Sequence, residues 1–491
     1  MYGACMYLSY LKVQNFKGMG CFHNEMHFAI PDMRTPGSGL NILVGENNSG
    51  KSTIFEAIDF LRNGTKSKMA DLKNKSAEQI APMFVEGEFV GDVNSVIESF
   101  IVPNKKKALS DQVFKKDGVE SLRIKRSSVD EGKSLVVYSP EIEDFKNVAG
   151  IDAPIKQLYE NNFIWADTNP SEEAKFGATT LCGVLLKEIA KASVTSPDYQ
   201  EFTESFHQFF NANDSDLRRR LLTIEQKMTS IFSSQFGEAK LRFHFDELTV
   251  DSFFKNSTIL VDDGVEVPMG QEGQGMQRSI ALALLQVYAD IIVQRAEAAR
   301  SKPFFLFIDE PELSLHPAGQ YTLLNALLSL SKTQQIFITC HSPIFLQNPQ
   351  IKNSRIFFFK KIASFNQIDT VESLDLFPWS PSWGEIVYKA YKLPTSEFHN
   401  ELYGYLETLL NDTKVNNYLN QKFNIPMSYT RIRSDNVCWN NLTLPVYLRH
   451  EIHHPETNGK NPYTTEDLDK SIEILIQAIK ARRKEMSESS R

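Results

Sequence analysis

The amino-acid sequence predicts an α/β fold in which a parallel sheet carries a phosphate-binding loop, with a large insertion and a separate C-terminal part. Three observations predict it. Residues 45–53 read Gly-Glu-Asn-Asn-Ser-Gly-Lys-Ser-Thr, a complete G-x-x-x-x-G-K-[ST] pattern. Two later apolar runs, 304–308 and 335–340, each end in polar residues that suit catalysis. More than half of the chain separates the loop from the first of these runs, so a large segment is inserted.

The phosphate loop has the context that its chemistry requires. It follows the apolar run 40–44 and precedes a helical pattern at 54–58. A glycine-rich turn at a helix start points backbone N–H groups at an anion. We expect Lys51 to neutralise the β- and γ-phosphates of ATP and the Ser52 hydroxyl to ligate Mg²⁺. The predicted ATP-binding residues are Gly45, Glu46, Asn47, Asn48, Ser49, Gly50, Lys51, Ser52 and Thr53.

The first later run is a predicted buried strand that ends in Asp309 and Glu310. In a nucleotide site, Asp309 is expected to hold Mg²⁺ through water, and Glu310 to polarise the attacking water as a catalytic residue. The next predicted strand ends at His341, whose neutral imidazole can donate a hydrogen bond to the γ-phosphate. We therefore predict that Glu310 and His341 are catalytic.

A second glycine-rich segment, Gly270 to Ser279, opens an apolar helical stretch before the Asp-Glu strand. Glycines at a helix start make a further anion-binding N-terminus. One active site needs only one phosphate loop, so we expect Gly273, Gln274 and Gly275 to face the nucleotide of another subunit.

The rest of the chain is predicted in coarser terms. Strands are expected at 84–89, 121–126 and 134–138, within a β-rich stretch. Residues from about 150 to 235 read mostly helical, for instance at 181–192 and 217–232. No heptad pattern runs long enough for a long coiled coil, so we expect a short helical arm instead. In the C-terminal part we predict helices at 396–411, 443–454 and 464–484.

Composition favours a soluble protein of several domains. Hydrophobic residues make up 42% of the chain and charged residues 23%, which is ordinary globular composition. No apolar run is long enough to span a bilayer, and the five cysteines lack C-x-x-C spacing. The net charge of −8 argues against a general nucleic-acid coat, although local basic clusters keep DNA or RNA open as a ligand. We expect a cytoplasmic protein with no membrane partner.

The motifs together resemble the ABC/SMC-type ATPases, and among them the "overcoming lysogenization defect"-like branch of bacterial defence ATPases. The resemblance implies an ATPase that uses Mg²⁺. The matching segments are Asn15-Phe16-Lys17-Gly18, residues 45–53, Gly273 to Arg278, Asp309-Glu310-Pro311-Glu312, Leu315-His316-Pro317 and His341-Ser342-Pro343. The chain departs from the pattern of transporters at Gln271 and Glu272, which stand where a serine contacts the partner subunit's γ-phosphate.

Four parts follow from this resemblance. Residues 1–145 are expected to form an ATPase lobe with the phosphate loop and a β subsheet, and residues 146–240 an inserted helical arm. Residues 241–380 are expected to form the lobe with the signature segment, the Asp-Glu strand and His341. A C-terminal helical interaction module is expected at 381–491.

The C-terminal part, through residues 397–404 and 448–455, resembles the PtuA family, the ATPase subunits of Septu-type antiphage systems. The resemblance implies a homo-oligomer assembled through ATP-bound head dimers and a separate HNH-type nuclease as partner. The AriA family of PARIS-type systems is the alternative, and it implies a topoisomerase–primase-type effector.

One histidine-rich segment, residues 449–456, carries three interpretations. Arg449 and His454 match the R-x4-H pattern of HEPN-type ribonucleases, which implies a self-contained nuclease gated by ATP. Alternatively, His450, His453 and His454 share a helical face and bind a metal. The third interpretation is a structural or docking role.

Overall fold

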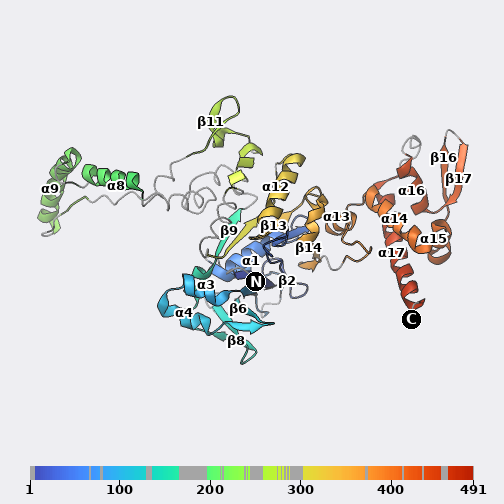
Figure 1. The fold of residues 1–491 in the computed structure, drawn as a ribbon, viewed down its shortest axis with the longest axis horizontal. Helices are drawn as coiled ribbons and strands as arrows, with labels where there is room; N and C mark the ends of the chain where they lie inside the picture. Colours follow the sequence, from blue (N-terminus) through green and yellow to red (C-terminus); the bar gives the residue numbers. More distant parts are fainter. Residues whose placement is uncertain are drawn as a thin grey trace. The chain divides into compact units, whose positions relative to one another are not determined.

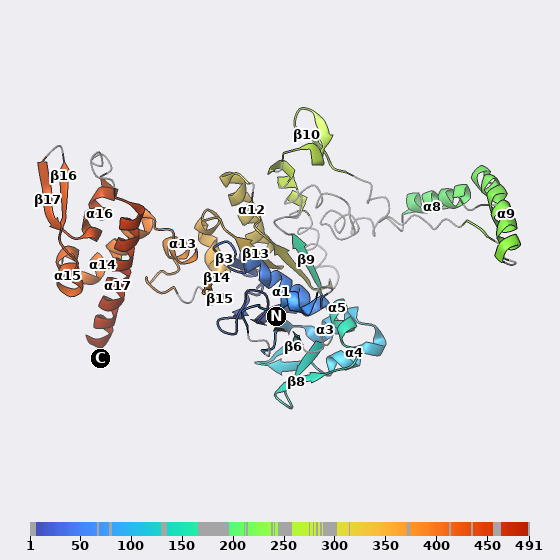
Figure 2. The same cartoon turned by 180° about the vertical axis from the view of Figure 1, so that it is seen from behind.

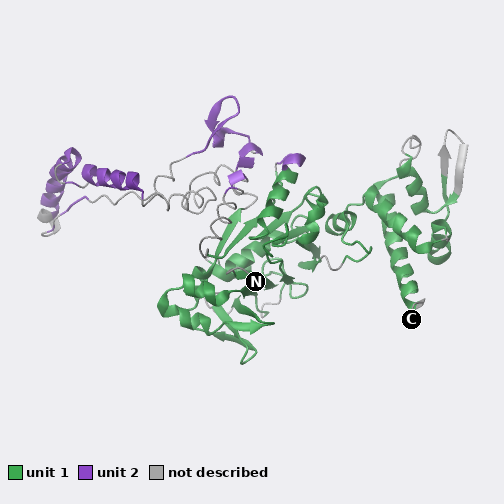
Figure 3. Cartoon of the chain, in the orientation of Figure 1, with its two compact units in different colours: residues 1–166, 296–313, 320–491 green, residues 167–295, 314–319 purple. Residues whose placement is uncertain are grey.

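The structure of this chain, a computed structural model, divides into two compact units. The first contains residues 1–166, 296–313 and 320–491, and the second contains residues 167–295 and 314–319 (Figure 3). The structure describes residues 6–65, 68–77, 81–128, 135–164, 196–210, 212, 215–236, 239, 241–243, 258–273, 275–277, 279–280, 283–284, 287, 302–313, 315–370, 374–411, 414–433, 436–454 and 463–489.

The central sheet of the first unit is mostly parallel, and only the pair at one edge is antiparallel. Its strands follow the order β15 (Phe365–Thr370), β14 (Arg355–Ile362), β3 (Leu40–Gly45), β13 (Gln335–Cys340), β12 (Phe304–Ile308) and β9 (Glu160–Ile164). Every residue of β3 and β13 is buried, as expected for strands covered on both faces. The carboxyl ends of β3, β12 and β13 meet at one edge, where α/β sheets bind ligands.

A second sheet is antiparallel throughout. Its strands follow the order β2 (Glu25–His27), β1 (Met6–Gln14), β4 (Phe84–Gly91), β6 (Val119–Ser127), β7 (Leu135–Ser139) and β8 (Asp144–Asn147), with β5 (Phe114–Lys116) paired to β6. Residues of β6 alternate between buried and partly exposed along most of the strand, which suits a sheet with one face on the core.

Helix α1 (Lys51–Asn63) lies between the two sheets (Figures 1 and 2). Its buried residues, among them Phe55 and Leu61, share one hydrophobic core with residues of both sheets. Gln335 also ties the sheets together, because its side chain accepts the Leu8 N–H at 2.9 Å and donates to the Leu8 carbonyl at 2.7 Å. Since α1 starts at the phosphate loop, this packing fixes the loop against the core.

Further helices and turns lie among the described residues before the C-terminal part. They are α2 (Met69–Leu72), α3 (Val93–Phe100), α4 (Pro103–Ser110), α5 (Asp152–Leu158), α12 (Pro317–Leu330) and the 3₁₀ turns η3 (Phe345–Gln347) and η4 (Pro349–Asn353).

The C-terminal part has a hydrophobic core of its own, which includes Leu402, Leu448 and Ile472. It contains α13 (Trp383–Tyr391), α14 (Ser396–Leu410), α15 (Val415–Phe423), α16 (Leu444–His453), α17 (Thr465–Ser489) and the hairpin of β16 (Tyr429–Arg433) and β17 (Asn436–Leu442).

The second unit contributes two helices and a hairpin to the described residues. These are α8 (Pro197–Phe210), α9 (Asp216–Phe236), β10 (Leu260–Asp262), β11 (Glu266–Pro268) and the turn η2 (Met269–Gln271). In α9, the buried Arg218 pairs with Glu225 at 2.9 Å, so a buried charge finds an opposite charge one to two turns away.

Most predicted elements are present, and two differences stand out. The α/β class, the strands of the β-rich segment and the helices α9, α14, α16 and α17 agree with the sequence prediction. The segment 146–240, predicted as a helical arm, first supplies β9 to the central sheet. The C-terminal part contains the hairpin β16–β17 besides its helices, and the predicted helix 181–192 lies outside the described residues. No helix in the described ranges is long and apolar enough to cross a membrane.

Candidate nucleotide site

The phosphate loop between β3 and α1 needs glycine at both ends. Gly45 has φ +151°, and a Cβ there would lie 2.2 Å from the Phe359 carbonyl oxygen. Gly50 has φ +94°, and a Cβ there would lie 2.4 Å from Asn366 Nδ2. The conformation and the close approach of β14 and β15 therefore exclude side chains at these positions.

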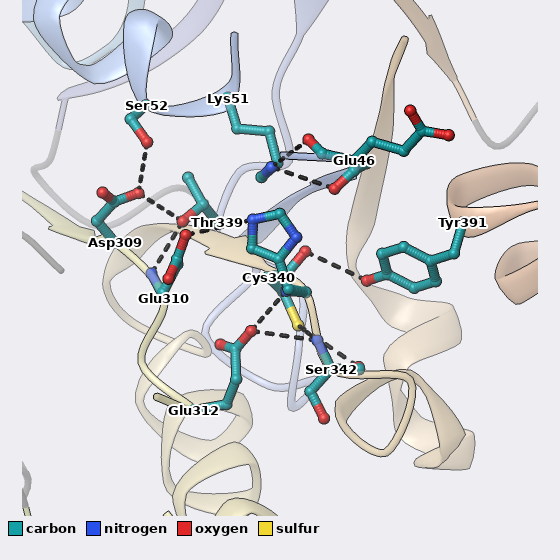
Figure 4. Close-up of polar contacts among 12 residues, drawn as sticks. Glu46, Lys51, Ser52, Asp309, Glu310, Glu312, Thr339, Cys340, Ser342 and Tyr391 are labelled. Atoms are coloured by element: carbon teal, nitrogen blue, oxygen red, sulfur yellow. Dashed lines mark hydrogen bonds and ion pairs between the residues drawn. The ribbon is translucent and has the colours of Figure 1, made fainter. Parts of the chain in front are cut away.

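Lys51 is almost fully buried. Its ammonium points back to the backbone of its own loop (Figure 4). Its ammonium donates to the Gly45 carbonyl at 3.1 Å and to the Glu46 carbonyl at 2.9 Å. Burial lowers the pKa of Lys51 to about 8, although Glu310 and Asp309 act in the opposite direction. A phosphate at the loop would supply the negative charge that this buried cation lacks.

Ser49 gives a second sign that the loop fits a ligand. Its side chain is 1% exposed, and its hydroxyl has no hydrogen-bond partner among the described residues. A buried hydroxyl without a partner is costly, and a phosphate oxygen is the acceptor that such a loop would offer it.

Ser52 and Asp309 meet although they lie far apart in the sequence. The Ser52 hydroxyl donates to Asp309 Oδ1 at 2.8 Å, and the Thr339 hydroxyl donates to the same oxygen at 2.6 Å. A hydroxyl and a carboxylate side by side supply the oxygen ligands that Mg²⁺ prefers. These residues therefore fit the predicted magnesium site, at the end of β12 beside the start of α1.

Glu310 and His341 face each other at the ends of β12 and β13. His341 Nε2 lies 3.2 Å from Glu310 Oε1. Glu310 has φ +49°, and its N–H donates to the Thr339 hydroxyl at 2.9 Å. Burial and the positive charge of Lys51 lower the pKa of His341, so the imidazole is neutral at physiological pH and can donate from Nε2.

Glu312 is a functional residue to which the sequence analysis gave no role. Its Oε1 accepts the His341 N–H at 2.5 Å and the Ser342 N–H at 3.2 Å (Figure 4). Burial raises the pKa of this carboxyl, and the hydrogen bond from the His341 N–H acts in the opposite direction. An acid two residues after Glu310 was the available signal, but sequence alone does not reveal which backbone it caps.

The predicted signature residues lie in the second unit. Gly273 accepts the Gln277 N–H at 3.1 Å, and the Gln277 side chain donates to the Glu272 carbonyl at 2.7 Å. A Cβ on Gly273 would meet nothing within 4 Å, and Gly275 begins the next helical turn. Gln274 lies outside the described residues.

Residues 449–454 of the histidine-rich segment form the end of α16 and its cap. Arg449 contacts His453 Nε2 and lies over the Tyr403 ring at 5.4 Å, so α16 meets α14 here. His399 of α14 is fully buried, and its Nε2 shares a hydrogen bond with the Ser471 hydroxyl at 2.9 Å. The sequence did not indicate that Tyr403 and His399 lie near this segment, because both are far from Arg449 along the chain.

The histidines of the segment do not all lie on one helical face, as the metal interpretation expected. His454 caps α16, so it does not continue the helical face of His450 and His453. No group of three His, Cys, Asp or Glu side chains gathers as a metal site in the part of the chain that the structure describes.

Comparison with known proteins gives one curated relative. The Old nuclease of Escherichia phage P2 is 29% identical over 327 residues, which are 64% of this chain and 54% of the relative. The chain therefore matches about half the length of this relative.

Solved structures that resemble the chain include an SMC head bound to the C-winged helix domain of ScpA, with a TM-score of 0.43 and 15% identity over 74% of this chain and 97% of that one. A second is an Smc head domain with an extended coiled coil, bound to a ScpA domain derived from Pyrococcus furiosus. Its TM-score is 0.41, with 15% identity over 74% of this chain and 96% of that one.

A protein-family model described as "AAA ATPase domain" matches residues 6–235 and 185–346. These ranges contain the phosphate loop, the Asp309-Glu310 pair and His341, and they cover more than half of the chain. The chain belongs to the AAA ATPase domain family.

Proposed function

We propose that this chain binds ATP with Mg²⁺ at the site between β3, β12 and β13 and hydrolyses it with Glu310 and His341. The observation that carries the proposal is the contact of Ser52 with Asp309, 2.8 Å apart, beside the 3.2 Å contact of Glu310 with His341. A metal-binding pair and a water-activating pair thus lie next to a buried lysine.

Each residue has a distinct role in the proposed hydrolysis. The loop N–H groups and Lys51 bind the β- and γ-phosphates, and Mg²⁺ held by Ser52 and Asp309 offsets their charge. Glu310 accepts a proton from a water whose oxygen attacks the γ-phosphorus, while the bond to the β–γ bridging oxygen breaks. Neutral His341 donates a hydrogen bond that orients Glu310 or the γ-phosphate. The products are ADP and phosphate.

We further propose that two copies of the chain close around ATP, with Gly273, Gln274 and Gly275 of one copy at the nucleotide of the other. Support comes from Gly273, which has open space around it at the start of a helical turn. Light scattering tests this with Glu310→Gln, which should bind ATP without consuming it. ATP is expected to increase the assembled fraction of Glu310→Gln, whereas Lys51→Ala should stay unaffected by ATP.

The biological role that we propose is regulation of a separate HNH-type nuclease in an antiphage defence complex in the bacterial cytoplasm. Support comes from the ATPase family and from a relative that is named as a nuclease, of which this chain matches only about half. Co-expression with the neighbouring open reading frame tests the proposal. An HNH protein that co-purifies supports it, and a topoisomerase–primase-type effector would instead favour a PARIS-like system.

A second candidate is a self-contained nuclease that uses the C-terminal Arg449 and histidines on RNA. The observation in its favour is the cluster of Arg449, His453, Tyr403 and His399, which joins α14 and α16. Arginine and histidine together suit the binding and cleavage of a phosphodiester. The purified chain should be incubated with tRNA and plasmid DNA. Cleavage that Arg449→Ala and His454→Ala abolish would favour this candidate over a partner nuclease.

A further inference from the structure

The loop that carries His341 is held from two opposite sides. On one side, Glu312 accepts the backbone N–H groups of His341 and Ser342. On the other side, helix α13 binds the carbonyl groups that flank them. The Tyr391 hydroxyl donates to the Cys340 carbonyl at 3.2 Å, and Trp383 Nε1 donates to the Pro343 carbonyl at 3.1 Å. Figure 4 shows Tyr391 reaching the loop from its own helix.

The two α13 side chains are placed by the geometry of the helix. Trp383 is the first residue of α13 and Tyr391 is the last, so they lie about two turns apart on similar faces. The start of α13 is fixed by a capping box, in which Ser382 accepts the Glu385 N–H and the Glu385 side chain accepts the Ser382 N–H. The two donors therefore span the loop from Cys340 to Pro343.

Helix α13 packs on the C-terminal part through its other residues. A Cβ on Gly384 would lie 2.6 Å from the Phe398 ring of α14, so these helices are in close contact. On α13, the Tyr388 hydroxyl donates to Asp469 of α17 at 2.7 Å. The loop of His341 and the C-terminal helices thus bind different residues of the same short helix.

The Tyr391 hydroxyl keeps its proton and can therefore always donate a hydrogen bond. Burial raises the pKa of Tyr391, and the nearby Cys340 and Glu312 raise it further. The phenol therefore stays protonated over the whole range in which the protein would work. It donates to a backbone carbonyl of the loop, so its contribution is to position the loop.

We propose that Trp383 and Tyr391 are positioning residues for ATP hydrolysis, which hold the loop so that His341 faces Glu310. This inference rests on the proposed function of Glu310 and His341. It makes the turnover of ATP depend on α13, an element outside the residues that the family model matches. Both side chains donate to the loop of His341 and not to the phosphate loop, so ATP binding is not expected to depend on them.

The test compares steady-state ATP hydrolysis by the full-length chain and its variants. Tyr391→Phe and Trp383→Phe each remove one donor and leave an aromatic ring. Each is expected to lower kcat about fivefold, the usual effect of one such hydrogen bond, and to leave the Kd for a non-hydrolysable ATP analogue unchanged. Tyr388→Phe is the matched control, because it removes a hydroxyl of α13 that does not contact the loop. It is expected to keep the wild-type kcat.

The outcomes separate this inference from the proposed function. A wild-type chain that does not hydrolyse ATP, or a Glu310→Gln variant that hydrolyses it at the wild-type rate, would overturn the proposed function. If Glu310→Gln is slow but Tyr391→Phe and Trp383→Phe keep the wild-type kcat, only the positioning role is overturned. If both variants bind the ATP analogue more weakly and also have a lower kcat, the positioning role is overturned as well, because such a result indicates a structural defect. A lower kcat with unchanged Kd in both supports it.

Discussion

At the scale of single residues, Lys51 shows most directly how burial of a charge is connected with ATP binding. Its ammonium is buried and its pKa is lowered to about 8, so burial of this charge destabilises the free protein. We predict that Lys51→Met does not lower the Tm of the free protein. The same change should weaken ATP binding by roughly 10- to 100-fold, because charged hydrogen bonds to phosphate are lost. Thermal unfolding with and without ATP measures both effects, and a Lys51→Met variant that ATP still stabilises fully contradicts the assignment.

Glu312 gives a prediction that separates its role from that of Glu310. Oε1 of Glu312 accepts both hydrogen bonds from the loop backbone, and an amide oxygen can accept the same two. We predict that Glu312→Gln keeps most of the wild-type kcat. Glu312→Ala should lose about tenfold or more, because the loop N–H groups lose their acceptor. Steady-state hydrolysis measures this, and equal rates for both Glu312 variants would count against the capping role.

His399 predicts how the C-terminal part responds to acid. Burial, with Arg449 and His453 nearby, lowers the pKa of His399 to about 4, whereas the unfolded value is about 6.5. The unfolded chain therefore binds more protons between these values, and stability falls as the pH falls. At pH 5 the loss is about 2 kcal/mol.

Hydrogen exchange of α14 and α17 at pH 7 and pH 5, corrected for the intrinsic rates, measures this loss. The His399→Gln variant is the control, because its amide can still bond Ser471 but does not titrate. It should lose much less stability between the two pH values. A wild type and a His399→Gln variant with the same pH response would contradict the prediction.

At this scale the sequence predicted phosphate-binding and metal-binding residues, since each belongs to a short motif with fixed spacing, and the structure brings Ser52 and Asp309 together. Glu312, Trp383 and Tyr391 received no role, because each acts on the backbone of a distant segment. Backbone groups carry no sequence pattern of their own. The contact of His399 and Tyr403 with the Arg449 segment was missed for the same reason, since it depends on how α14 packs against α16.

At the scale of elements, we predict opposite effects on stability when two helical glycines are replaced by alanine. In α13, a Cβ on Gly384 would lie 2.6 Å from the Phe398 side chain, whereas a Cβ on Gly404 in α14 would meet nothing within 4 Å. We predict that Gly384→Ala destabilises the C-terminal part by about 1–3 kcal/mol through overpacking. Gly404→Ala should stabilise it by about 0.5–1 kcal/mol, since alanine favours a helix. Urea unfolding of both variants measures these changes, and a Gly384→Ala variant as stable as wild type would contradict the packing.

Elements with strong periodicity were predicted well, and those set by tertiary pairing were not. Helices α9, α14 and α17 begin after Ser215, Thr395 and Thr464, whose hydroxyls accept backbone N–H groups of the first turn. Strand β9 is only partly buried and reads as an ordinary polar segment, so nothing local places it beside β12. The hairpin β16–β17 has bulged pairing that its sequence does not reveal.

At the scale of the whole molecule, the fold joins the two halves of one site across more than half of the chain. Parallel pairing of β3, β13 and β12 brings Ser52 to Asp309 and His341 to Glu310. The sequence predicted this meeting because carboxyl ends of parallel strands share an edge. It did not predict that α13, which leads into the C-terminal part, would contact the loop of His341.

The central claim, that Glu310 and His341 act on ATP bound at the phosphate loop, is tested most directly by hydrolysis and binding measured on one variant. ATP binding and phosphate release should be compared for wild type and Glu310→Gln under identical conditions. We predict that Glu310→Gln binds ATP with the wild-type Kd but hydrolyses it roughly 100- to 1,000-fold more slowly, because the general base is lost. A Glu310→Gln variant that releases phosphate at the wild-type rate would contradict the claim.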